Sequence, residues 1–203
     1  MVRLSLLLSL LVVAQVATAQ RNMSTGDDII RKGLFAAHFT IVPGWTIADG
    51  NTNLYLHGRS EFYLNRKVSI VGDGYYFLDT QGDGYLKHNH GVFFGANYHF
   101  PYKRFDPYIG FMPGVSMVQV SKAGISTPEL QIAGRESVFT VEPAISVAAG
   151  FNLYIWKFFH FMGQVHYVHA NHATEWEQLY ALDEFRLSFG LGWNVNMIRA
   201  RKR

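Results

Sequence analysis

The chain has 203 residues, of which 49% are hydrophobic, 15% aromatic and only 16% charged, a composition that excludes a disordered or acidic-tail protein. It has no cysteine, which excludes disulfide frameworks, thiol chemistry and cysteine-ligated zinc. The formal net charge of +3 lies largely in the last residues, 199–203. Such a short tail is not a binding face, so no nucleic-acid partner is expected.

The first residues are typical of a secretory signal peptide. Arg3 supplies a positive charge, residues 4–13 form a hydrophobic run, and Ala17-Thr18-Ala19 matches the small-residue cleavage motif. The run is too short for a membrane-spanning helix, which needs about 20 apolar residues. We therefore expect export and cleavage after Ala19.

Beyond this segment the sequence alternates with the period of two that is typical of β-strands. The pattern is clearest over residues 185–197, where large apolar residues occupy one parity and Arg, Ser, Gly and Asn the other. Residues 139–155 alternate in the same way, with a second parity of small and polar residues. In chain order, eight strands are predicted near 33–42, 54–64, 68–78, 90–100, 107–120, 137–155, 159–169 and 184–197.

The connections between these strands alternate in length. Long polar loops are expected at 43–53, 79–89, 121–136 and 170–183, and short turns at 65–67, 101–106 and 156–158. Outer-membrane barrels have tight turns at the periplasmic end, long loops outside and strands of about 9–11 residues. The sequence therefore predicts an all-β fold, an eight-stranded antiparallel up-and-down transmembrane β-barrel.

A soluble barrel around an apolar ligand is the alternative fold. Its exterior would carry the polar parity, but here that parity holds few charges among Gly, Ser, Ala and Asn, and these cannot solvate a surface. Small polar side chains do fit the narrow lumen of an eight-stranded barrel. The membrane barrel is therefore favoured.

Three segments carry a resemblance to a known group: Pro107-Tyr108-Ile109-Gly110, residues 150–154 and residues 186–193. With them, residues 33–197 resemble the small outer-membrane β-barrels of Gram-negative bacteria, the OmpA-like and OmpX-like barrels and their Bacteroidetes relatives. The resemblance implies a location in the bacterial outer membrane, insertion by the barrel-insertion machinery, contact with outer-membrane lipids and no reaction. A monomer without a cofactor is expected. The implied division of the chain is signal peptide 1–19, periplasmic segment 20–32, barrel 33–197 and basic tail 198–203.

Charged residues on the inward parity form the candidate site. They are Arg59, Glu61, Asp73, Glu142 and Arg186. If the turn at 65–67 closes its hairpin tightly, Arg59 stands opposite Asp73 with Glu61 nearby, whereas Arg186 is expected to meet Glu142 nearer the outer rim. Because unpaired buried charges cost several kcal/mol each, an ion-pair network that packs the lumen is predicted. A gate or proton path is the alternative interpretation.

Two patterns suggest metal sites. His88, His90, His166, His169 and His172 have ligand-like spacings, but residues i and i+3 of a strand point to opposite faces, so no metal is expected. The segment 79–84 resembles the start of a calcium loop, although the twelfth position is His90 where a bidentate Glu is required. Asx-turns explain its Asp and Gly residues equally well, and calcium binding stays open.

The segment 169–173 is loosely similar to the His-x-Ser-Asn-Ala signature of the outer-membrane lipid A deacylases. Asn171 stands at the serine position, so His169, with Glu175 or Glu177 as its acid, would lack a nucleophile. An enzyme is therefore not expected. The sequence favours a barrel with a plugged lumen that has a structural role or interacts through its loops. The alternatives are a small pore and a lipid A-modifying enzyme.

Overall fold

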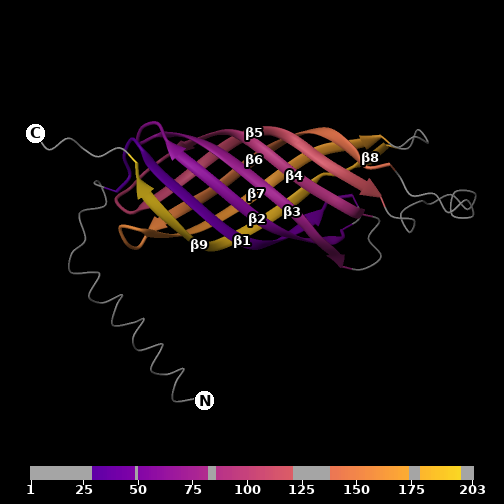
Figure 1. The fold of residues 1–203 in the computed structure, drawn as a ribbon, viewed down its shortest axis with the longest axis horizontal. Helices are drawn as coiled ribbons and strands as arrows, with labels where there is room; N and C mark the ends of the chain where they lie inside the picture. Colours follow the sequence, from indigo (N-terminus) through magenta and orange to yellow (C-terminus); the bar gives the residue numbers. More distant parts are fainter. Residues whose placement is uncertain (1–28, 49, 82–85, 121–137, 174–178, 198–203) are drawn as a thin grey trace, which may run out of the picture.

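The computed structural model describes residues 29–48, 50–81, 86–120, 138–173 and 179–197. They form an antiparallel barrel with its long axis horizontal in Figure 1. Its strands are β1 (Leu34–Thr46), β2 (Thr52–Tyr63), β3 (Val68–Gln81), β4 (Leu86–His99), β5 (Phe105–Val120), β6 (Thr140–Tyr154), β7 (Phe159–Ala173), β8 (Leu179–Ala181) and β9 (Glu184–Asn196). None of the described segments is a helix long and apolar enough to cross a bilayer.

Eight long strands close the sheet on itself. Each pairs with its neighbour in the chain, β6 also pairs with β7, and β1 pairs with β9. The three-residue β8 pairs only with residues 171–173 of β7, at the end away from the short turns. The predicted eight-stranded up-and-down barrel is confirmed, with β8 as an addition that the sequence did not indicate.

The predicted alternation in loop length is confirmed only in part, because two of the four connections expected to be long loops are as short as the turns at the other end. The short connections are 64–67, 100–104 and 155–158. At the other end β1 continues to Thr46, so 47–51 replaces the expected loop 43–53; likewise β3 and β4 leave only 82–85 of 79–89. The backbone pairing continues over these residues, since Trp45 pairs with Thr52 and Gln81 with the same Thr52.

Other predicted segments fall largely outside the described residues. They are the signal peptide 1–19, most of the segment 20–32, the loop 121–136 and the tail 198–203. The last predicted loop, 170–183, is shorter than expected because β7 reaches Ala173 and β8 occupies part of the remainder.

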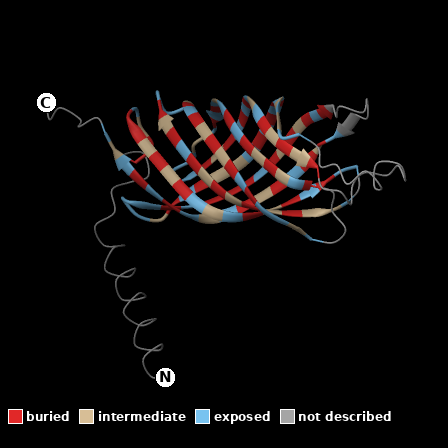
Figure 2. Ribbon diagram, turned by 45° about the vertical axis from the view of Figure 1, so that its right-hand side comes forward, coloured by how far each residue is buried: buried red, intermediate tan, exposed pale blue. Residues whose placement is uncertain are grey.

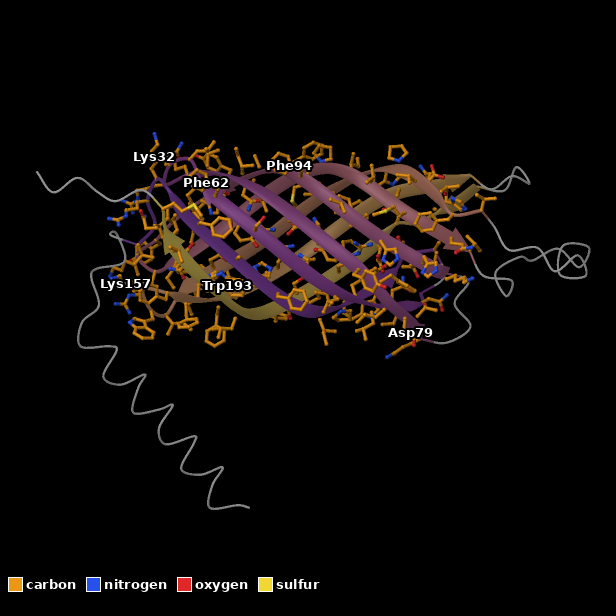
Figure 3. The ribbon with its side chains drawn as sticks, viewed as in Figure 1. Lys32, Phe62, Asp79, Phe94, Lys157 and Trp193 are labelled. Carbon is orange, nitrogen blue, oxygen red and sulfur yellow. The ribbon has the colours of Figure 1, made fainter. Side chains whose placement is uncertain are left out.

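Large apolar side chains cover the outside of the barrel. Figure 2 shows buried and exposed residues alternating along the strands, and Phe94 and Trp193, labelled in Figure 3, are 65% and 50% exposed. On β9 the exposed positions include Phe189, Leu191 and Val195, the parity predicted to face outward. A band of exposed aromatic and aliphatic residues around a closed barrel is the surface of a protein immersed in lipid.

The exposed band predicts a strong penalty for charge. Leu191, 50% exposed near the middle of β9, faces the lipid, so Leu191→Arg is expected to destabilise the barrel by about 2–4 kcal/mol. Buried Asn194 donates to the Lys157 carbonyl over 2.6 Å, so Asn194→Ala is expected to cost about 1–2 kcal/mol. Unfolding in lipid vesicles measures both, and equal losses would contradict the assignment of faces.

The segment before β1 folds into the short-turn mouth of the barrel. Gly33 takes a left-handed conformation (φ 84°) that reverses the chain, and its N–H donates to the Tyr63 carbonyl over 2.9 Å. Ile30 is thereby fully buried in an apolar cluster with Leu34, Tyr63 and Tyr154. Part of the predicted periplasmic segment therefore acts as a stopper.

Candidate functional site

Three clusters of bonded polar side chains occupy the lumen at successive levels. We name them by their central residues: the Glu61 cluster near the short turns, the Arg59 cluster at mid-height and the Glu184 cluster toward the long loops. Period-two alternation puts these residues on the inner face, and all three central residues are at most 4% exposed.

The Arg59 cluster lies where β2 and β3 pair. Arg59 and Asp73 are direct partners in the strand register, and the guanidinium donates to the Asp73 carboxylate over 3.0 Å. The same Nη1 donates to Gln164 Oε1 on β7 over 2.6 Å, and the Tyr108 hydroxyl donates to that oxygen over 2.8 Å. His57 of β2 lies 3.2 Å from Asp73, so the charged pair is held within the β2–β3 hairpin as well as across the lumen by β7.

The Glu61 cluster gathers donors from β3 and β4 on one carboxylate. Glu61 Oε1 accepts from Ser69 Oγ at 2.5 Å, from Asn97 Nδ2 at 2.6 Å and from His99 Nε2 at 3.0 Å. The Arg59 Nη2 lies 3.8 Å from the same oxygen, which joins this cluster to the one above. A buried carboxylate with this many donors is stabilised in its charged form.

His99 connects Glu61 to a second buried acid. Its Nδ1 lies 3.0 Å from Asp106 Oδ2 and its Nε2 3.0 Å from Glu61 Oε1. Only the imidazolium form donates from both ring nitrogens, so this geometry fits a protonated His99 between two carboxylates. Tyr63 donates to the same Asp106 oxygen over 2.6 Å, and its hydroxyl lies 2.9 Å from that of Tyr154 beside the Ile30 stopper.

The Glu184 cluster closes the lumen toward the long loops. Arg186 donates from Nε to Glu184 Oε2 over 2.8 Å, and its guanidinium lies 4.2 Å and 4.5 Å from the ring centres of Tyr55 and Tyr75. The Glu184 carboxylate also accepts from Tyr55 and from Asn53, at 2.8 and 2.9 Å. A Cβ at Gly44 would clash with this carboxylate, so a larger residue there would displace Glu184 from its place in the cluster.

The structure brings together some of the predicted site residues and separates others. Arg59, Glu61 and Asp73 lie in contact at the expected places. The expected Arg186–Glu142 pair is wrong: Arg186 lies on Glu184, and Glu142 lies 3.1 Å from His172 with its side chain 19% exposed.

The displacement of Glu142 follows from the strand register. Arg186 is paired with His166 of β7, which is paired with Ala148 of β6. Glu142 lies six residues further along β6, about 20 Å away at 3.3 Å per residue. Because the strands of a barrel are tilted and staggered, equal counts from the turns do not give equal levels on different strands.

The histidine and calcium patterns do not combine into a site among the described residues. His166 is fully buried in the lumen, whereas the His169 side chain is 42% exposed, as the strand geometry predicted. Nowhere in the described part of the chain do three or more His, Asp or Glu side chains group as metal ligands. The Asp79–Gly84 pattern is only partly described, and Asp79 itself is exposed.

The deacylase-like segment lies at the loop end of β7. His169 Nδ1 lies 2.5 Å from Asp183 Oδ1, so Asp183 takes the place that was expected for Glu175 or Glu177, which lie outside the described residues. The Asn171 side chain is exposed at the serine position, and an amide does not supply a nucleophile.

Comparison with known proteins identifies the fold. No protein-family model and no curated sequence matches the chain. Solved structures do match it: Pseudomonas aeruginosa OprG (TM-score 0.61, 11% identity), Neisserial surface protein A (0.60, 11%) and the N-terminal β-barrel domain of Pseudomonas aeruginosa OprF (0.55, 14%). The matches cover 81–82% of this chain and 97–99% of those chains. The chain therefore has the fold of the small eight-stranded outer-membrane β-barrels.

Proposed function

We propose that the protein resides in the bacterial outer membrane as a closed barrel whose work is structural or is done by its loops. The observation that carries this proposal is the filling of the lumen by the three clusters. Their charged groups bond across the barrel, from β2 to β7 at Arg59 and from β2 to β9 at Glu184. Function in such a barrel is placed on the connections, because the rigid interior is already occupied.

The short-turn mouth supports the same proposal. Ile30 and the hydroxyl pair of Tyr63 and Tyr154 lie below the Glu61 cluster, so a solute would have to displace an apolar stopper and then charged, bonded groups. Breaking a buried ion pair costs about 3–5 kcal/mol. A steady open pore is therefore disfavoured.

Recording in planar bilayers tests the closed lumen. The folded barrel is expected to give no steady conductance above leak, and a heat-modifiability gel on the same preparation establishes that the inserted protein is folded. Steady steps that scale with folded protein would contradict the plugged lumen and favour the small pore.

A further inference from the structure

A second feature lies outside the lumen, at the short-turn end. Seven basic residues of the described chain gather there: Arg31, Lys32, Arg66, Lys67, Lys103, Arg104 and Lys157. Figure 3 shows Lys32 and Lys157 at this end and Asp79 at the opposite one. The nearest described carboxylates, Glu61 and Asp106, point into the lumen and are bonded to His99. The outer surface of this rim is therefore strongly cationic.

Within this rim the β2–β3 and β4–β5 turns form a pocket of about 330 Å³ that is open to solvent, at the lower end of the volumes of small-molecule sites. It is lined by Arg66, Lys67, Tyr98, His99, Phe100 and Pro101. The two basic side chains are exposed, as are Tyr98 (43%) and Phe100 (52%). His99 itself is buried and faces the lumen, so the accessible lining is cationic and aromatic.

The pocket is held in shape by its backbone. Asn65 Oδ1 accepts from the Lys67 and Val68 N–H groups at 2.7 and 3.0 Å, which fixes the first turn. The His99 N–H donates to the Lys67 carbonyl over 2.8 Å and ties the two turns together. The rings of Tyr98 and Phe100 pack edge to face, 5.1 Å apart. A ligand would therefore meet a preorganised site.

The apolar wall of the pocket continues into the lipid-facing surface. Phe94, Ala96, Tyr98 and Phe100 are alternate residues of one strand and its end, and all four are exposed outward. A molecule with an anionic head at Arg66 and Lys67 could thus lay an apolar chain along this stripe. The short-turn end faces the periplasm in barrels of this fold, where the adjacent leaflet is a source of such molecules.

We propose that this pocket binds the phosphate head of an anionic phospholipid of the inner leaflet, with its acyl chains along the outward stripe of β4. A basic side chain close to an anionic headgroup favours its binding by about fivefold, and this gain falls off with distance from the headgroup. Lys103 and Lys157 belong to the same rim but do not line the pocket, and their amines lie 5.5 and 5.2 Å from the ring centres of Tyr102 and Phe158.

The test titrates short-chain phosphatidylglycerol into the full folded barrel in zwitterionic detergent and counts bound lipid by native mass spectrometry. Arg66→Gln with Lys67→Gln is expected to weaken binding about twenty-fivefold. The matched control, Lys103→Gln with Lys157→Gln, removes the same charge from the same rim and is expected to change binding less than about fivefold. Equal losses would show general rim electrostatics and overturn the site.

Two further measurements keep the test decisive. Exchanging the two residue types, as Arg66→Lys with Lys67→Arg, keeps both positive charges and is expected to retain binding. This variant separates loss of charge from a misfolded turn. Phosphatidylcholine of the same chain length is expected to bind more weakly than phosphatidylglycerol, and inorganic phosphate is expected not to compete. Competition by phosphate would mean a simple anion site, and equal binding of both lipids would remove the role of charge; either result overturns the proposal.

Discussion

Arg59→Ala is expected to lower the free energy of unfolding by about 3–5 kcal/mol. The substitution removes the donor to Asp73 and Gln164 and leaves the Asp73 carboxylate, which is 2% exposed, without its cation. Denaturant unfolding of the barrel in lipid vesicles, followed on heat-modifiability gels, measures the loss. Ser146→Ala is the control, since this buried lumen hydroxyl donates only a neutral bond, to the Met112 carbonyl, and is expected to cost about 1 kcal/mol.

The double variant decides whether Arg59 and Asp73 act as a pair. Arg59→Ala with Asp73→Ala is expected to recover part of the loss, because neither charge is then left alone in the lumen. A double loss equal to the sum of the single losses would contradict the pairing seen at 3.0 Å. The 3.8 Å contact between Glu61 and Arg59 is lost in both the single Arg59 variant and the double variant, so it cancels from the coupling energy of the Arg59–Asp73 pair.

Glu184→Ala is expected to be similarly destabilising, by about 3–5 kcal/mol. It leaves the Arg186 guanidinium between the Tyr55 and Tyr75 rings with no carboxylate at the 2.8 Å position, and it removes the acceptor of the Tyr55 hydroxyl. The same unfolding assay applies.

Glu142→Ala provides the matched control, since Glu142 is the acid that the sequence analysis predicted as the partner of Arg186. Its partly exposed contact with His172 is expected to contribute about 1 kcal/mol or less. A larger loss for Glu142→Ala than for Glu184→Ala would contradict the contacts described for the Glu184 cluster.

The comparison of sequence and structure shows what strand periodicity can predict. Alternation along β9 identified its lipid-facing residues, and counting from the turn at 65–67 placed Arg59 opposite Asp73, because a tight hairpin fixes the register of its two strands. The same counting misplaced Glu142, because it joined strands that are not paired with each other and ignored the stagger of the barrel.

Several lumen residues were missed for identifiable reasons. Asp106 was assigned to a turn, whereas β5 begins at Phe105 and directs the carboxylate inward. Glu184 lies on the inward parity together with Arg186 and could have been found from that alternation. The role of Ile30 had no signal in the sequence, because it depends on the reversal of the chain at Gly33.

The seam between β1 and β9 governs how the molecule acquires its structure. Leu34 pairs with Asn196, so the contact that closes the sheet joins the two ends of the barrel sequence. Until that contact forms, the side chains of the three clusters face an open sheet rather than an enclosed interior, and their charges remain hydrated. The ion pairs can therefore reach their final geometry only after the barrel has closed. Assembly is accordingly expected to be a single cooperative event of high contact order, slow and without a stable half-barrel.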